Sequence, residues 1–288
     1  MVVEHLLPAG WLERKRQFAF FIGLFYAIIG IIIAKALFPD DPSLVAIAFT
    51  SILLLPLLRK LFTIEEKQEK REKRFSLVHL FRDEGDFISV YFLLALGVFA
   101  TYCVASMILP GFEINALFRD QLELRGANGG AIFTAGLFID ILLNNWWVFL
   151  ACFVLSWIAG DGAIFLITWN ASLWGTIFGV TARSAALASQ GNPWWYLAIV
   201  LLIIAPHAII EMLSYILGGI GGGLISADLE REKGERKTPR PHVFYSYVGM
   251  IILAGLILLL IGALVETFVL DNVVLYQEIV AQSFMAAS

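Results

Sequence analysis

Five polar side chains interrupt three long apolar stretches between residues 137 and 224, and their chemistry sets the first question about this chain. They are Asn144, Asn145, Asn170, His207 and Glu211. A charged side chain at mid-bilayer costs about 2.5–3.5 kcal/mol on insertion scales, so such groups persist where they face a partner, a cavity or a pathway. The sequence therefore predicts a polar core inside a membrane.

His207 and Glu211 lie four residues apart, so on a helix they share one face and can touch. We expect Glu211 to be protonated or paired, because an isolated buried carboxylate is too costly to stay charged. His207 is its nearest candidate partner. The adjacent Pro206 predicts a helix kink, since proline removes one backbone donor and frees the carbonyl of Leu202. His207 or Asn170 could supply that carbonyl with a partner.

The depths of these groups follow from a helical rise of about 1.5 Å per residue. Counted from the aromatic run at 194–196 and the turn at 160–162, Asn170 and His207 fall at a similar level. Glu211 is expected one turn nearer the cytoplasm, and Asn145 one or two turns nearer the outside. This predicts a descending series of polar groups, which would act as interhelical hydrogen bonds or as a relay, and no compact ligand set.

Composition places these groups in a polytopic, all-α membrane protein. Of 288 residues, 59% are hydrophobic and 15% charged, whereas a soluble domain is close to a quarter charged. The net charge of -4 resides in loops and says little about partners. Cys103 and Cys152 both fall inside apolar segments and predict no disulfide framework and no metal knuckle.

Seven segments are long enough to cross a bilayer, which takes about 20 helical residues. They lie near 18–38, 43–62, 87–110, 131–159, 163–188, 193–224 and 243–270. Sixteen of the 20 lysines and arginines fall in the N-terminal tail and the loops at 59–86 and 226–242. The positive-inside rule then predicts a cytoplasmic N-terminus and, after seven crossings, an external C-terminus.

Residues 1–86 are expected to form a two-span anchor with a charged cytoplasmic helix at 65–74, and residues 87–288 a five-span bundle. That charged helix is either a solvated extension or a docking arm. Outside the membrane, apolar residues at helical spacing over 114–122 predict a short amphipathic helix on the outer surface. Small residues predict close helix packing; they are Gly160, Ala171, Gly175, Gly179, Gly218 and Gly222.

Four motifs in this order resemble the stage II sporulation protein M family. They are Leu143-Asn144-Asn145, Gly160-Asp161-Gly162, Trp169-Asn170-Ala171-Ser172 with Gly175, and Pro206-His207 with Glu211 and Gly218. The resemblance covers residues 131–226, and the N-terminal spans with their charged arm resemble its archaeal branch. The resemblance implies a multi-pass protein of the cell membrane. The family's sporulating members resemble partners of peptidoglycan-degrading enzymes, and that role applies to cells with a peptidoglycan wall.

Three function classes follow. The first is a non-enzymatic organiser that binds other membrane or cytoplasmic proteins, or a second copy of itself, in the bilayer. The second is a transporter or proton pathway that uses Asn145, Asn170, His207 and Glu211 as a relay. The third is an intramembrane metal enzyme, but His207 and Glu211 supply two ligands where a catalytic zinc usually has three from protein. No catalytic residue, metal, cofactor or nucleic-acid partner is predicted.

Overall fold

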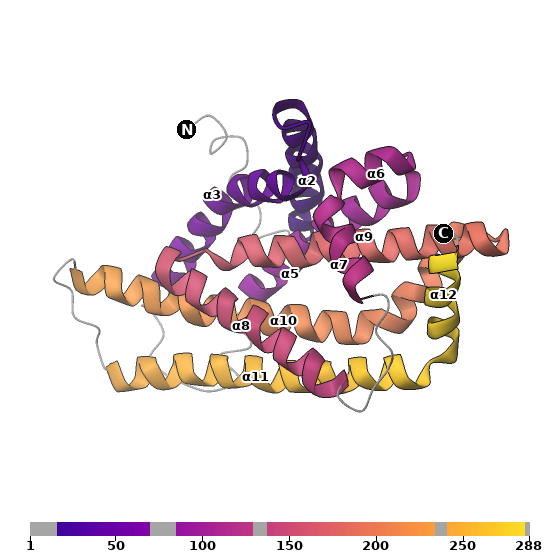
Figure 1. Ribbon diagram of the computed structural model, residues 1–288. Helices are drawn as coiled ribbons and strands as arrows, with labels where there is room; N and C mark the ends of the chain where they lie inside the picture. The colour runs from indigo at the N-terminus through magenta and orange to yellow at the C-terminus, as the bar shows by residue number, and fades with distance from the viewer. Residues whose placement is uncertain (1–15, 70–84, 129–136, 234–240, 286–288) are drawn as a thin grey trace.

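The computed structural model describes residues 16–69, 85–128, 137–233 and 241–285, and these residues form helices joined by short turns (Figure 1). The helices are α2 (Phe18–Leu37), α3 (Ser43–Glu69), α5 (Gly85–Ile108), α6 (Gly111–Leu117), α7 (Arg119–Asn128), α8 (Leu137–Ala159), α9 (Ala163–Ser189), α10 (Pro193–Lys233), α11 (Pro241–Asn272) and α12 (Val274–Met285). The prediction of an all-α polytopic membrane bundle is confirmed.

Six helices in the described ranges are long and apolar enough to cross a membrane: α2, α5, α8, α9, α10 and α11. The second predicted span corresponds to α3, whose apolar part, Ser43–Leu58, is shorter. The predicted charged helix continues α3 as far as Glu69, and its remaining residues lie outside the described ranges. If α3 does not cross the membrane, the number of crossings is even and the two termini lie on the same side of the membrane. If α3 crosses, they lie on opposite sides.

Seven crossings predict that a cysteine placed at Ser288 reacts with a membrane-impermeant maleimide added from outside the cell. The native Cys103 and Cys152 are both buried, so they should contribute little background labelling. Labelling of the Ser288→Cys variant from the cytoplasmic side alone would mean an even number of crossings, with α3 as the segment that does not span.

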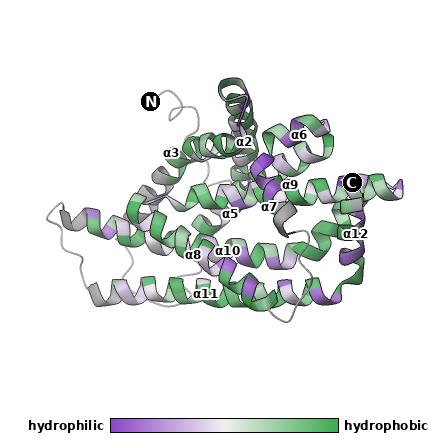
Figure 2. Cartoon of the chain, in the orientation of Figure 1, coloured by the Kyte–Doolittle hydropathy of each residue, from purple (hydrophilic) through white to green (hydrophobic). Residues whose placement is uncertain are grey.

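Three long helices run side by side and form the largest layer of the molecule. Figure 1 shows α9, α10 and α11 stacked in this way, with α8 crossing them diagonally. α5 packs against both α9 and α2, and α3 packs against α2 and α9. α12 follows α11 and packs across α9. Apolar residues dominate the long helices, and polar residues gather on α12 and around α6 and α7 (Figure 2).

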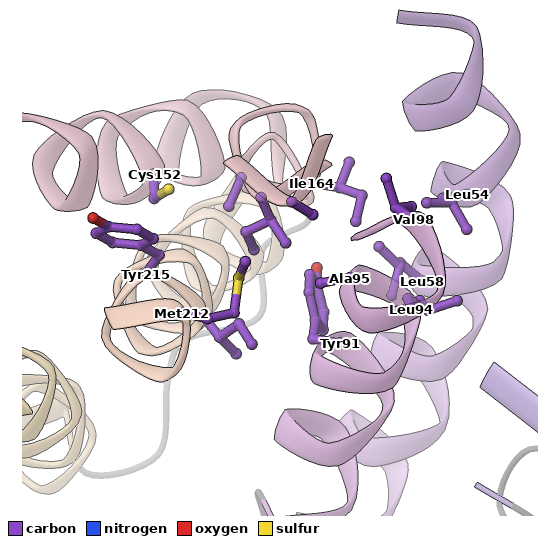
Figure 3. Close-up of a cluster of buried hydrophobic side chains, with 14 of the residues drawn as sticks. Leu54, Leu58, Tyr91, Leu94, Ala95, Val98, Cys152, Ile164, Met212 and Tyr215 are labelled. Carbon is purple, nitrogen blue, oxygen red and sulfur yellow. The ribbon is translucent and has the colours of Figure 1, made fainter. Parts of the chain in front are cut away.

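The helices α2 and α3 form a pair that we call the N-terminal hairpin. The main apolar core lies where this hairpin, α5 and the layer of long helices meet. Figure 3 shows Leu94 and Val98 of α5 facing Leu54 and Leu58 of α3. On the other side of α5, Ile164 and Met212 bring in α9 and α10. A smaller cluster around Ile279 fixes α12 to α9 and α10. The polar site described below therefore belongs to a packed interior.

Small residues bring helix backbones into direct contact at several of the predicted positions. A Cβ added at Gly175 would lie 2.5 Å from the carbonyl oxygen of Phe99 on α5, and one at Gly179 2.6 Å from that of Cys103. On α10, Gly218 packs against Phe149 of α8, and Gly222 packs against the backbone of the same helix. Ala171 is fully buried. These contacts join α9 to α5 and α10 to α8.

Gly160 requires a correction, because it lies at no such contact. Its φ is +71°, and a Cβ added there would meet nothing within 4 Å. Residues other than glycine rarely adopt this left-handed conformation. Gly160 therefore serves the tight turn between α8 and α9.

The predicted amphipathic helix is two short helices, α6 and α7, and it packs into the bundle. Ile114 and Phe118 belong to the main core, and Gln121 is 0% exposed. Gln121 accepts a hydrogen bond from Ser43 Oγ at 2.8 Å and donates one to Ser172 Oγ at 3.3 Å. One face of α6 and α7 is therefore held by polar contacts to α3 and α9. The opposite face is exposed, with Phe112 72% exposed, so the predicted amphipathic character holds, while a position on the membrane surface stays a prediction.

Ion pairs reinforce this attachment between α6–α7 and the N-terminal hairpin. Lys35, near the end of α2, pairs with Glu113 of α6. Arg119 of α7 pairs with Asp41 in the α2–α3 turn at 2.8 Å. Exposed pairs of this kind contribute about 0–1 kcal/mol each, so the buried Ser43–Gln121–Ser172 contact is the stronger constraint.

Candidate functional site

A chain of hydrogen bonds crosses the interior between α8 and α10. Tyr215 Oη donates to Asn145 Oδ1 at 2.9 Å, and Asn145 Nδ2 donates to Glu211 Oε1 at 2.7 Å. All three residues are buried, with Tyr215 1% exposed. Tyr215 and Glu211 lie one turn apart on α10, so Asn145 reaches across to one helix face and binds both.

A second carboxyl group extends this chain to α11. The side chain of Glu266 hydrogen-bonds to that of Glu211. One turn before Glu266 on α11, Gly262 lies against Glu211, and a Cβ added at Gly262 would be 2.8 Å from Glu211 Cγ. The absence of a side chain at Gly262 thus leaves room for the glutamate between α10 and α11. Three helices are joined by this network, which we call the carboxyl network: Asn145, Glu211, Tyr215 and Glu266.

The carboxyl network is surrounded by buried side chains. Figure 3 shows Cys152 of α8 beside the ring of Tyr215, and Cys152 is completely buried. Ser214, which precedes Tyr215 in sequence, donates a hydrogen bond to the carbonyl oxygen of Gly255 on α11 at 2.8 Å. Such a site raises the cost of any charge placed in it, because little water reaches it.

The expected partnership of His207 with Glu211 is wrong. Glu211 bonds to Asn145 and Glu266. His207 is 6% exposed, and its Nδ1 has no hydrogen-bond partner among the described residues. The i,i+4 spacing places both side chains on one side of α10, but stronger partners from α8 and α11 occupy the carboxyl group.

The expected separation in depth is wrong as well, since Asn145 and Glu211 touch. Asn170 is buried on α9, where its Nδ2 donates to the carbonyl oxygen of Leu166 in its own helix at 2.8 Å. Asn144 is exposed and donates to Asn145 Oδ1 at 3.3 Å. Pro206 lies exposed inside the continuous α10. Of the five predicted polar residues, Asn145 and Glu211 form the site.

Glu266 was not among the predicted site residues, although the sequence carries a signal for it. It is an acidic residue inside the last apolar segment, which by the same reasoning as for Glu211 requires a partner. Within the described ranges, no group of three or more His, Cys, Asp or Glu residues is placed to hold a metal ion. The amide, hydroxyl and carboxyl groups of the carboxyl network can form hydrogen bonds and exchange protons.

The family model described as Stage II sporulation protein M matches residues 87–269. This range runs from α5 almost to the end of α11, so it contains the whole carboxyl network and extends beyond the 131–226 of the predicted resemblance. The helices α2 and α3 precede it. No curated protein and no solved structure matches the chain.

Proposed function

Because the chain belongs to the stage II sporulation protein M family, we propose that it is a non-enzymatic membrane subunit that holds partner proteins in the bilayer. The observation that carries this proposal is that buried hydrogen bonds connect different helices. Asn145 binds Glu211 across α8 and α10, Ser214 binds the Gly255 carbonyl across α10 and α11, and Thr101 binds the Leu24 carbonyl across α5 and α2. These polar groups fix helices to one another, as a rigid platform requires.

The face offered to a partner is assigned to α8. Of the six long apolar helices, α8 has the smallest buried share, and it lies within the family-matched range. Trp147 is 65% exposed, and Trp146 and Trp157 are also exposed. Tryptophan is enriched at the energetic centres of protein interfaces. The partner proposed for this face is a transmembrane helix of another protein.

Replacing Trp147 with alanine is expected to lower the recovery of that partner about tenfold or more, since a hot-spot aromatic contributes about 2 kcal/mol or more to binding. The measurement is quantitative mass spectrometry of proteins that co-purify, in stoichiometric amount, with the tagged full chain from native membranes. Phe25→Ala is the matched control, because Phe25 is 58% exposed on α2, outside the family-matched range. Equal recovery with both variants would remove α8 as the docking face.

A second candidate function, a proton pathway, gains support from Glu266, which places a second ionisable group beside Glu211. Proton flux into proteoliposomes containing the purified chain tests it. Flux that disappears in Glu211→Gln, with no stoichiometric partner in native membranes, would replace the organiser by a transporter.

A further inference from the structure

We propose that Glu211 and Glu266 form a binding site for one proton, held between the two carboxyl groups, and that this proton fastens α11 to α10. The proposal goes beyond the organiser function and needs no partner protein. It rests on the hydrogen bond between the two side chains, on the contact of Glu211 with Gly262 and on the donors supplied by Asn145 and Tyr215.

A hydrogen bond between two carboxyl groups requires a proton on one of them, since a carboxylate is an acceptor alone. Two carboxylates in hydrogen-bond contact in a poorly hydrated site repel each other, and such pairs share one proton. The pair therefore binds the proton as a unit: one carboxyl donates, and the other accepts and keeps the negative charge.

Burial assigns the proton to Glu211. Its side chain is 4% exposed, whereas Glu266 is partly exposed, and a charge costs more in the deeper position. Glu211 Oε1 already accepts the 2.7 Å hydrogen bond from Asn145, which leaves the second oxygen to carry the proton and donate. Asn145 is in turn oriented by Tyr215, so its amide presents nitrogen to Glu211.

The neighbouring helices add no positive charge that could replace the proton. α8 contributes the amide of Asn145 and, beyond it, the thiol of Cys152 beside Tyr215. α10 itself contributes Tyr215 and His207, one turn to either side of Glu211. Among the described residues, no lysine or arginine of α5, α9 or α12, which also pack against this helix pair, acts on either carboxyl group.

Loss of the proton therefore leaves two carboxylates facing each other with no cation between them. The repulsion acts between Glu211 and Glu266, one turn from the contact of Glu211 with Gly262, where α11 lies close to α10. The folded state binds a proton that the unfolded chain at neutral pH does not hold, so stability falls as pH rises. The site makes the α10–α11 contact dependent on proton concentration.

The test uses the full-length protein in detergent, with thermal unfolding followed from about pH 6 to about pH 9, the range in which free carboxyl groups no longer titrate. For the wild type we expect the Tm to fall on the order of 5 °C or more across this range. In Glu266→Gln an amide replaces one carboxyl and can donate to Glu211 in place of the proton, so the fall should shrink. In the double variant with Glu211→Gln neither carboxyl remains, and the fall should disappear. Glu278→Gln, at an exposed carboxyl of α12, is the control and should keep it.

Infrared spectroscopy gives an independent measurement. The carbonyl stretch of a protonated carboxyl group should be present in the wild type at neutral pH and absent from Glu211→Gln. A Tm independent of pH in the wild type, an equal fall in the double variant, or no protonated-carboxyl band at neutral pH would overturn the proposal. Should Glu211→Gln fail to fold, Glu266→Gln and the wild-type spectrum still decide. Partner recovery is not involved, so the organiser function stands or falls separately.

Discussion

Gly175→Leu is expected to destabilise the bundle by about 3 kcal/mol or more, the upper end of the cost of overpacking a protein interior. The first carbon of the new side chain alone would lie 2.5 Å from the carbonyl oxygen of Phe99 and 3.0 Å from the backbone nitrogen of Cys103. Backbone atoms cannot rotate away as a flexible side chain can, so α9 must separate from α5. Thermal unfolding in detergent measures the loss.

Gly249→Leu is the matched control for this substitution. Gly249 is also helical, on α11, but a Cβ added there would meet nothing within 4 Å. We expect its Tm to stay near the wild-type value. If Gly175→Leu unfolds at the same temperature as Gly249→Leu, α5 and α9 are not in backbone contact, and the packing described for this face is wrong.

Asn145→Leu is expected to cost about 2 kcal/mol, because the substitution removes the centre of the hydrogen-bond chain. Tyr215 loses its acceptor and Glu211 loses its donor, and a buried polar group left without a partner costs about 1–3 kcal/mol. The side chain keeps its branched shape and its number of non-hydrogen atoms, so the loss reports chiefly on hydrogen bonding. The measurement is again thermal unfolding of the purified chain.

The adjacent Asn144 provides the control. It is exposed, and its hydrogen bond to Asn145 is long at 3.3 Å. Asn144→Leu should therefore change stability by no more than about 0.5 kcal/mol, as exposed substitutions usually do. Equal losses in the two variants would show that the carboxyl network does not depend on Asn145.

Hydropathy predicted the helices well and their ends less well. The span predicted at 163–188 is α9, Ala163–Ser189. The span predicted at 193–224 is α10, which continues to Lys233. The difference arises because hydropathy detects where apolar residues stop, while a helix continues through residues such as Leu229 and Glu230 that favour helical structure. For α3 the opposite holds, since a long helix has a short apolar part.

The sequence identified individual residues of the site but not which of them contact each other. Asn145 and Glu211 stand out because each interrupts an apolar segment. Their contact joins helices 66 residues apart, and a single sequence gives only local neighbours, such as His207 one turn from Glu211. Glu266 also interrupts an apolar segment, near the end of the span predicted at 243–270. Its partner is visible only once α10 and α11 are placed together.

The attachment of α6–α7 to the N-terminal hairpin has a consequence for how the protein is made. During synthesis α2 and α3 leave the ribosome first, at about 5–20 residues per second, yet Ser43 meets Gln121 only after 78 further residues. Ser172, the third member of that contact, follows 51 residues after Gln121. Ser43 therefore lacks its partner until α7 has been made, and Gln121 lacks its own partner until α9 follows. By contrast, α10 and α11 are neighbours in sequence and can associate as they emerge. The final positions of α2 and α3 thus depend on α9, which is synthesised long after both of them.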